Sequence, residues 1–466
     1  MGRLFGTDGV RGVAGAELTA RLAMDLAVAA VPVLAPAATQ STGVGSPRPV
    51  AVIGRDSRAS GDFLEASVVA GLASSGVDVL RLGIIPTPGV AFLTGALNAD
   101  FGVVLSASHN PAGDNGIKFF GPGGVKLSDE TEDAIEACLR AAEADGDPAR
   151  SAKAAMAAGG FGRVTDAYSA HETYLDHLLA SLPVAANGQP PLHGLRVVVD
   201  CAHGAAYSIG PRALRRAGAE VIAIGAAPDG LNINAGVGST HLDSLAAAVV
   251  EHGADAGLAF DGDADRCLAV DGDGRQLDGD QILAILASRL KHSNQLAGDG
   301  VVVTVMSNLG FHVAMRQAGI SVIETPVGDK HVYAAMRDGG YVLGGEQSGH
   351  IIQFGHATTG DGVLTGLHLL AAVNSAGVPV SAAASLMTRY PQVLINVRGD
   401  KDRAMADPVL AEAVSAAKDK LGGAGRVLLR PSGTEPVIRV MVETQSAGLA
   451  EQVAGQLADA VRLAMS

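Results

Sequence analysis

Tryptophan is absent from this chain, and aromatic residues of all kinds account for only 3% of it. Proteins that hold single-stranded nucleic acid usually stack the bases on aromatic side chains, so the composition argues against this class of partner. Cations are also outnumbered, and the formal net charge is −14. Because such a chain repels polyanions, an anionic substrate must be captured by a few cations placed close together.

Cysteine is equally scarce. Cys138, Cys201 and Cys267 are odd in number and widely separated, which argues against a disulfide framework or a thiolate metal site and predicts a reducing, cytoplasmic location. Long apolar runs are missing as well: the longest, which starts at Leu26, is short for a membrane span and contains two prolines. The opening MGRLFG lacks the order of a signal peptide. We therefore expect no membrane partner.

A threefold repeat organises most of the sequence. At 466 residues the chain is too long for one ordinary core, and three copies of one pattern occur, each with three apolar strands separated by Ala- and Leu-rich helical segments. The nine strands begin close to Val50, Gly76, Ala99, Leu195, Gly218, Ala254, Gly300, Gly319 and Gly339. Each copy is typical of a small α/β unit.

After about residue 385 the pattern changes to a strand, a helix, two strands and a closing amphipathic helix, which predicts a smaller α+β domain. We read residues 36–49 as a surface loop and residues 151–160 as a linker. The predicted domains are residues 1–160, 161–275, 276–385 and 386–466.

Three aspartates follow the third strand of the second copy. In FDGDADRC, Asp261, Asp263 and Asp265 alternate with small residues, which let the backbone curl and aim three carboxylates at one point. Such hard oxygen ligands suit Mg²⁺. The alternative is an acidic, solvated turn. An EF-hand is excluded, because Arg266 and Gly272 stand where that motif requires glycine and glutamate.

A serine lies in the equivalent place of the first copy, in VLSASHNP. A turn or capping role is the ordinary interpretation of Ser108. A hydrolase nucleophile would require G-x-S-x-G, but the serine lies in SASHN, which has neither glycine. A serine near magnesium can instead carry a phosphoryl group whose charge the metal neutralises.

Two further loops are rich in polar groups. The third copy ends in GEQSGH, where Glu346 and Ser348 suit sugar hydroxyls and His350 is titratable. Near the C-terminus, RPSGTEPVIRV combines hydroxyls, bare backbone N–H groups and guanidinium groups, which make a phosphate cradle. Its residues are Arg430, Ser432, Gly433, Thr434 and Arg439. The alternative for this segment is a plain hairpin turn.

Taken together, SASHNP, DGDADR, GEQSGH and RPSGTEP, in this order after an opening FGTDGVRG, resemble the α-D-phosphohexomutase superfamily, and within it the bacterial branch that acts on glucosamine phosphate. The resemblance covers essentially the whole chain. It implies a heart-shaped α/β protein of four domains around a central cleft, with three related α/β units with mixed sheets and a smaller C-terminal α+β phosphate-binding domain.

The resemblance also implies a reaction. The enzyme would be an isomerase that interconverts glucosamine 6-phosphate and glucosamine 1-phosphate, through glucosamine 1,6-bisphosphate, and supplies precursors of UDP-N-acetylglucosamine and the cell wall. Ser108 would carry the phosphoryl group, and a phosphate oxygen would complete the shell of one Mg²⁺ held by Asp261, Asp263 and Asp265.

Roles for the other residues follow from the same resemblance. Lys118, Arg11 and His350 match the family's candidates for acid/base and charge-stabilising work, and the C-terminal cradle would hold the phosphate that is not reacting. Arg266 would brace the metal loop, and His109 would shape the serine loop. In VGDKHV, Lys330 and His331 replace the arginine and tyrosine common in relatives, so a substrate contact by Lys330 stays open.

Three alternatives remain. A phosphoglucomutase or phosphomannomutase would differ only in the sugar, although Gln347, where those relatives commonly have methionine, favours the amino sugar. A phosphatase with Asp261 as nucleophile is disfavoured by Asp265, which stands where that motif wants Thr or Val. A phosphosugar sensor has no need of metal, serine and cradle together. The oligomeric state is open, and a homodimer is one expectation.

Overall fold

The computed structural model describes residues 3–6, 8–36, 48–145, 160–183, 188–431 and 436–465. Its contacts divide the chain into two compact units. The first comprises Met1–Val305 and Ile323–Ala384, and the second comprises Met306–Val322 and Ser385–Ser466. The loop predicted at 36–49 and the linker predicted at 151–160 lie almost wholly outside the described residues.

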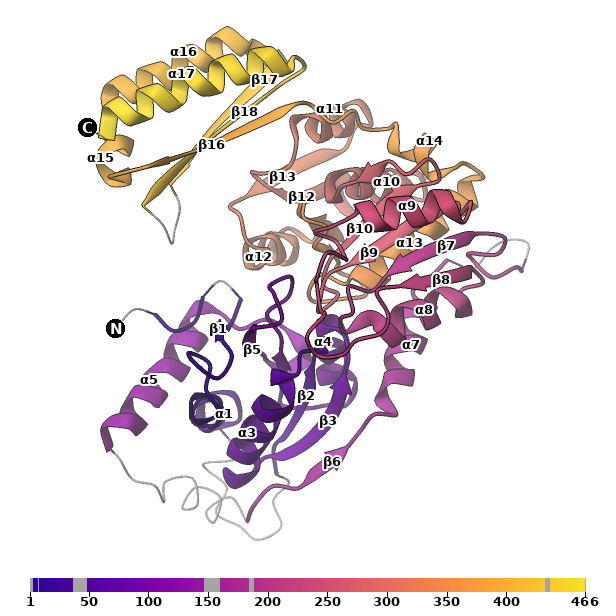
Figure 1. The fold of residues 1–466 in the computed structure, drawn as a ribbon, viewed down its shortest axis with the longest axis vertical. Coiled ribbons are helices and arrows are strands. Elements are labelled where there is room, and N and C mark those ends of the chain that lie inside the picture. The colour runs from indigo at the N-terminus through magenta and orange to yellow at the C-terminus, as the bar shows by residue number, and fades with distance from the viewer. Residues whose placement is uncertain are drawn as a thin grey trace. The chain divides into compact units, whose positions relative to one another are not determined.

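The first sheet has six strands in the order β1-β5-β4-β2-β3-β6 (Figure 1). The strands β4, β2, β3 and β6 are parallel, whereas β5 pairs antiparallel with both β4 and β1. A parallel strand covered on both faces needs a nearly continuous apolar sequence, and β4, FGVVL, is buried at every position. The bounds are β1 Val10–Val13, β2 Val50–Arg55, β3 Asp78–Ile84, β4 Phe101–Leu105, β5 Asp114–Phe120 and β6 Val164–Asp166.

Helices α1, α3 and α5 pack together beside this sheet, and α4 packs on β2 and β4. Leu26 of α1 and Leu64 and Leu72 of α3 are fully buried in the resulting core. The side chain of Thr19 caps α1 by accepting the backbone N–H of Leu22 at 3.2 Å. The bounds are α1 Ala20–Leu34, α3 Ser60–Ser74, α4 Thr87–Ala96, η1 Pro122–Gly124 and α5 Asp129–Asp145.

The second sheet has the order β11-β10-β9-β7-β8. The strands β9, β7 and β8 are parallel, and β10 runs antiparallel to β9 and β11. A hairpin turn at Asp271 connects β10 to β11, and the carbonyl oxygen of Asp271 accepts the N–H of Gly274 at 3.0 Å. The bounds are α7 Ala170–Ala180, β7 Arg196–Asp200, α8 Ala206–Arg216, β8 Glu220–Ile224, α9 Asp243–Glu251, β9 Ala256–Phe260, β10 Cys267–Asp271 and β11 Gln276–Leu277.

The third sheet has the order β13-β12-β14-β15, with β12 and β14 parallel and β15 antiparallel to β14. Its elements are α10 Gly279–His292, η2 Ala297–Asp299, β12 Gly300–Thr304, α11 Leu309–Gln317, β13 Ser321–Thr325, α12 Asp329–Gly339, β14 Leu343–Gly345, β15 Ile351–Gln353, α13 Gly362–Ala376 and α14 Val380–Ala384. By its contacts, α11 belongs to the second compact unit.

The remaining part of the second unit is a three-stranded antiparallel sheet, β16-β18-β17, with α16 and α17 packed side by side (Figure 1). Its core includes Ile438, Val440 and Leu457. The bounds are β16 Gln392–Arg398, α15 Lys401–Met405, α16 Pro408–Leu421, η3 Gly422–Ala424, β17 Gly425–Pro431, β18 Val437–Thr444 and α17 Ala447–Met465. The α+β fold predicted for the C-terminal part of the chain is therefore confirmed.

The threefold repeat is confirmed strand by strand. The first three sheets contain the same four-strand order, namely β5-β4-β2-β3, β10-β9-β7-β8 and β15-β14-β12-β13. In each copy the last of these four strands in the sequence runs antiparallel to its neighbour. The mixed sheets implied by the resemblance are thus present in all three copies. Among the described residues, no helix combines the length and the apolar character needed to cross a bilayer.

One buried contact ties the start of α13 to α7. The carboxylate of Asp361 caps α13 through the N–H of Leu364 at 2.9 Å and accepts the hydroxyl of Tyr174 at 2.7 Å. A lost N-cap costs about 0.5–2 kcal/mol, and a stranded buried hydroxyl costs about 1–3 kcal/mol. We expect Asp361→Ala to lower the free energy of unfolding by about 2–4 kcal/mol in urea titrations.

Thr19→Ala is the matched control, because it removes a helix cap in the same unit without stranding a buried partner. Its expected cost is about 0.5–2 kcal/mol. Equal losses in Thr19→Ala and Asp361→Ala would mean that the Tyr174 contact adds nothing.

Candidate active site

The three polar motifs of the repeat occupy equivalent places in the fold. Each connects the third strand of a copy, β4, β9 or β14, to the antiparallel strand that follows it. Loops at the carboxyl ends of parallel strands are where α/β proteins bind ligands. The structure brings these loops into contact: Ser108 Oγ lies 2.6 Å from Asp261 Oδ2, and His350 Nδ1 lies 3.5 Å from Asp265 Oδ2.

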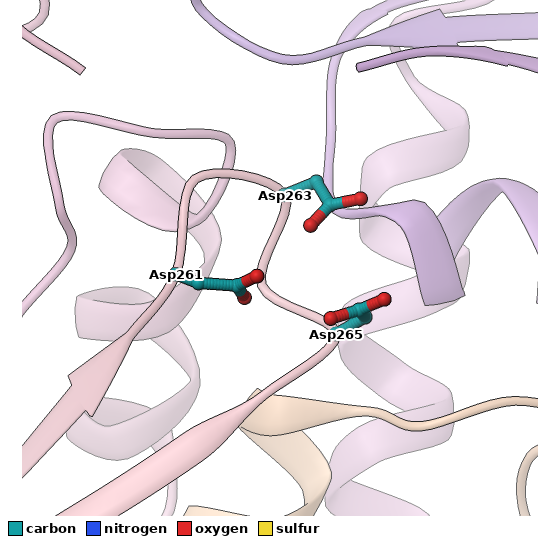
Figure 2. Close-up of side chains that lie close together, drawn as sticks. All are labelled: Asp261, Asp263 and Asp265. Atoms are coloured by element: carbon teal, nitrogen blue, oxygen red, sulfur yellow. The ribbon is translucent and has the colours of Figure 1, made fainter. Parts of the chain in front are cut away.

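The aspartate loop forms a crowded group of carboxylates. One oxygen from each of Asp261, Asp263 and Asp265 lies within 4.8 Å of the others, and Figure 2 shows the three side chains close together on one loop. This loop connects β9 to β10. All three are buried. Burial raises the pKa of Asp261 well above its ordinary value, and repulsion from Asp265 and Asp263 adds to this shift.

The donor set of this loop fits a hard divalent cation. Among the described residues, Asp263 Oδ1 and Asp265 Oδ1 are buried without a hydrogen-bond partner, and such oxygens are costly to bury unless something binds them. Three oxygen donors at this spacing are what Mg²⁺ prefers in proteins. The sequence therefore identified a group of side chains whose arrangement in the fold fits a metal site.

The backbones of the serine loop and the aspartate loop approach each other closely. Ala264 has φ +57°, in the left-handed region that side chains rarely adopt. A Cβ at Gly262 would lie 2.5 Å from the carbonyl oxygen of Ser108, so only glycine allows this approach. In the same way, a Cβ at Gly349 would lie 2.4 Å from the carbonyl oxygen of Cys267, where β10 begins.

Ser108 is buried and held in a strained conformation. Its φ is +52°, and such strain persists only where the surroundings enforce it. The N–H of Ser108 donates to Ser106 Oγ at 2.9 Å, and its carbonyl oxygen accepts from Arg58 at 3.1 Å and from Asn234 at 2.9 Å. The hydroxyl, in contrast, faces the carboxylates, with His109 Nδ1 3.4 Å away.

Arg58 supports this loop from beneath. It is fully buried and pairs with Asp56, and its guanidinium donates to the carbonyl oxygens of Ser108 and Asn110. Asp56 in turn accepts the hydroxyl of Ser106 at 2.5 Å. Sequence reasoning did not select this pair, although GRDSR places charged residues at the end of the apolar strand β2, which is the same signal that marked the other loops.

Lys118 and Arg11 both approach the site from the first sheet. Lys118 Nζ lies 2.9 Å from Asp263 Oδ2 and 2.7 Å from Asp8 Oδ2. Burial acts to lower the pKa of Lys118, but Asp263 and Asp8 outweigh burial and raise it above its ordinary value. Arg11 also pairs with Asp8, at 2.6 Å, and reaches the carbonyl oxygen of Ala107 at 3.4 Å.

His350 lies between two carboxylates. Its Nδ1 is 3.5 Å from Asp265 Oδ2 and its Nε2 is 3.5 Å from Asp329 Oδ2. Burial acts to lower the pKa of His350, but Asp265 and Asp329 outweigh burial and raise it. The N–H of Gly360 also donates to Nε2 at 3.0 Å. That bond requires Nε2 to be unprotonated, so it opposes the effect of Asp329 at the same nitrogen.

The other predicted site residues of the third copy contact side chains of the protein itself. Ser348 Oγ donates to Glu346 Oε2 at 3.2 Å, so these two half-buried side chains lie together. Gln347 donates to Asp278, which caps α10, at 3.3 Å. Lys330 Nζ lies 2.8 Å from Glu132 and 3.2 Å from Asp129, both on α5.

Arg266 lies at the end of the aspartate loop, where its backbone N–H donates to Asp261 Oδ1 at 3.2 Å and its Nε lies 3.8 Å from Asp265 Oδ1. Asp8, Lys126 and Asp329 also belong to this neighbourhood, but sequence reasoning did not select them. Lys126 pairs with Asp8 and Asp329, each more than a hundred positions away from it, and no local pattern marks such pairs.

The second unit presents two arginines opposite one another. Arg430 of β17 pairs in register with Arg439 of β18, and directly opposed like charges destabilise a sheet unless an anion compensates them. Burial lowers the pKa of Arg430, and repulsion from Arg439 adds to this effect. The three residues predicted to share this cradle, Ser432, Gly433 and Thr434, lie outside the described residues.

Sequence models of one family match all four parts of the chain. Their descriptions are phosphoglucomutase/phosphomannomutase, α/β/α domains I, II and III, at residues 2–145, 172–274 and 278–390, and the C-terminal domain, at residues 394–460. The fold and the site thus define a phosphohexomutase.

Two close relatives narrow this class. The phosphoglucosamine mutase of Thermobifida fusca is 61% identical over 463 residues, covering 99% of this chain and 98% of that protein. The phosphoglucosamine mutase of Streptomyces griseus is 58% identical over 466 residues, covering 100% of both. The chain belongs to the phosphoglucosamine mutase family.

Solved structures support the same fold. A phosphoglucomutase/phosphomannomutase family protein from Burkholderia thailandensis has a TM-score of 0.79 at 23% identity, covering 99% of this chain and 97% of that one. An Aspergillus fumigatus N-acetylphosphoglucosamine mutase, solved in complex with GlcNAc-6P and magnesium, has a TM-score of 0.64 at 18% identity, covering 99% and 96%. At these identities the likeness is one of architecture.

The crowded carboxylates generate a prediction about stability. Mg²⁺ at about a hundred times its dissociation constant should stabilise the folded protein by about 2.7 kcal/mol. Asp261→Asn removes one of the three repelling charges, so we expect it to melt at a higher temperature than the wild type in chelator and to lose most of the Mg²⁺ response. Thermal unfolding with EDTA and with Mg²⁺ measures both effects.

Asp273→Asn, an exposed aspartate of the β10–β11 hairpin, serves as the control and should respond to Mg²⁺ as the wild type does. A wild type whose melting temperature is indifferent to Mg²⁺ would contradict the metal assignment.

Proposed function

We propose that this phosphoglucosamine mutase family member interconverts glucosamine 6-phosphate and glucosamine 1-phosphate with Ser108 as the phosphoryl carrier. The observation that carries the proposal is the buried Ser108 hydroxyl, 2.6 Å from Asp261 within the group of three carboxylates. A serine held there can accept a phosphoryl group beside a cation. The product would enter the synthesis of UDP-N-acetylglucosamine and cell-wall precursors.

Asp261, Asp263 and Asp265 would hold one Mg²⁺, together with a phosphate oxygen carried by Ser108. When bound, the metal would neutralise negative charge on the transferring phosphoryl group. Two carboxylate oxygens of this loop lack a hydrogen-bond partner among the described residues, which supports that assignment.

Three side chains near the serine loop are candidates for proton transfer and for stabilising the charge of the phosphoryl group. Lys118 and His350 lie in ion-pair contact with carboxylates of the metal loop, and Arg11 donates to the backbone of the serine loop. We assign acid/base and charge-stabilising roles to these three, because a group must lie within reach of the reacting oxygen to move its proton.

The sugar and the second phosphate need separate binding groups. Glu346 and Ser348 present a carboxylate and a hydroxyl for sugar hydroxyls, and Lys330 would contribute if substrate displaces its bonds to α5. We assign the phosphate that is not reacting to Arg430 and Arg439, with Ser432, Gly433 and Thr434. Glucosamine 1,6-bisphosphate would form, turn over, and return its other phosphate to Ser108. The homodimer and the cytoplasmic location stay predictions.

Two assays test the mutase activity and the phosphorylation of Ser108. A coupled assay should show faster turnover of glucosamine 6-phosphate than of glucose or mannose 6-phosphate. Incubation with the 1,6-bisphosphate, followed by peptide mass analysis, should place phosphate on Ser108, and Ser108→Ala should lose nearly all activity. Ser67→Ala, a serine whose hydroxyl bonds its own helix, should behave as the wild type. Full activity in Ser108→Ala would refute the carrier role, and preference for glucose or mannose phosphate would favour the alternative sugar.

The paired arginines make a second prediction. A charge-assisted bond to phosphate is worth about 1.5–3 kcal/mol, or roughly ten- to a hundredfold in affinity, so Arg430→Ala should raise KM by that factor. It should also release free 1,6-bisphosphate during turnover, while Ser108 can still be phosphorylated. Arg462→Ala, an exposed arginine of α17, is the control. If Arg430→Ala binds substrate normally but cannot be phosphorylated, the cradle assists the chemistry instead.

A further inference from the structure

Lys126 joins two copies of the repeat through a single ammonium group. It follows η1 in the first copy, and only 14% of its side chain is exposed. Its Nζ lies 2.9 Å from Asp8 Oδ1 and also pairs with Asp329, the first residue of α12 in the third copy. One largely covered cation is therefore shared by carboxylates that are over three hundred positions apart in the sequence.

The Asp8 side of this arrangement leads to the metal loop. The other oxygen of Asp8, Oδ2, lies 2.7 Å from Lys118 Nζ and 2.6 Å from Arg11 Nη2. Lys118 continues to Asp263 Oδ2 at 2.9 Å. Lys126 holds one oxygen of Asp8, which leaves the second oxygen facing two of the proposed catalytic groups.

The Asp329 side leads to the same loop by another route. The Oδ2 atom that pairs with Lys126 lies 3.5 Å from His350 Nε2, and His350 Nδ1 lies 3.5 Å from Asp265 Oδ2. The series Asp263, Lys118, Asp8, Lys126, Asp329, His350 and Asp265 thus connects two metal-loop carboxylates, and Lys126 is its midpoint.

Charge makes Lys126 hard to replace. Burial acts to lower its pKa, but Asp329 and Asp8 outweigh burial and raise it, so the side chain stays an ammonium. Without it, the partly buried carboxylates of Asp8 and Asp329 would each lose a cation, and a partly buried charge that loses one partner moves toward the cations that remain. Asp8 and Asp329 would then turn toward Lys118 and His350. Shifts of about 1 Å in such groups can cost about a hundredfold in rate.

We propose that Lys126 is a positioning residue for phosphoryl transfer, which orients Lys118 through Asp8 and His350 through Asp329. This inference rests on the proposed function and adds to it a residue that acts only through other side chains. A positioning role of this kind affects the chemical step more than the binding of substrate.

The test compares Lys126→Met, which keeps the length of the side chain but removes the charge, with Lys126→Arg, which keeps the charge. We expect Lys126→Met to lower kcat at least tenfold with KM within about threefold of the wild type, and Lys126→Arg to recover most of that loss. Lys291→Met, whose ion-pair partner Asp299 is outside the series, should turn over as the wild type does.

Folding is followed by thermal unfolding, because a variant that merely unfolds would lose kcat in proportion to its folded fraction. If Lys126→Met does not fold, Asp329→Asn breaks the same series at the next residue and should show the same split between kcat and KM. Folded Lys126→Met with kcat within twofold of the wild type, or a loss seen entirely in KM, would overturn the inference. An inactive wild type would instead refute the proposed function.

Discussion

The mutual repulsion of three buried carboxylates is the constraint around which the rest of this site is arranged. Their oxygens lie within 4.8 Å of one another in a chain that is already strongly acidic. Such a group is stable only if cations and hydrogen-bond donors surround it. Lys118, His350 and the Ser108 hydroxyl each contact one of these carboxylates. Two of the carboxylate oxygens still lack a hydrogen-bond partner among the described residues. These are the oxygens that a divalent cation would satisfy.

Repetition of one fold explains how three loops reach the same place. Because the strand order β5-β4-β2-β3 recurs in the second and third sheets, the connection after each third strand is the same structural element with different side chains. The first copy contributes a hydroxyl, the second carboxylates and the third an imidazole. Identical topology fixes the position of each loop, which leaves the loop sequences free to differ in chemistry.

Gln347, the residue on which the sugar prediction rested, makes a hydrogen bond within the protein. Gln347, which favoured the amino sugar in the sequence, donates to Asp278 at the start of α10. Its visible effect is to anchor the GEQSGH loop, where Glu346 and Ser348 lie. The contact that the structure gives Gln347 is therefore one that holds the loop on which Glu346 and Ser348 lie.

The sequence by itself determined the strands of the repeat, the C-terminal α+β domain, and the groups of residues at the strand ends. These follow from short-range patterns, because apolar periodicity and alternating carboxylates are properties of neighbouring residues. The resemblance added the family. Only the tertiary structure decided that Arg58 supports the serine loop, that Ser108 is held at positive φ, and that Lys126 bridges Asp8 and Asp329. Each of these depends on charges or backbone atoms that folding brings together from distant positions, and local sequence carries no record of which partner a buried charge will find.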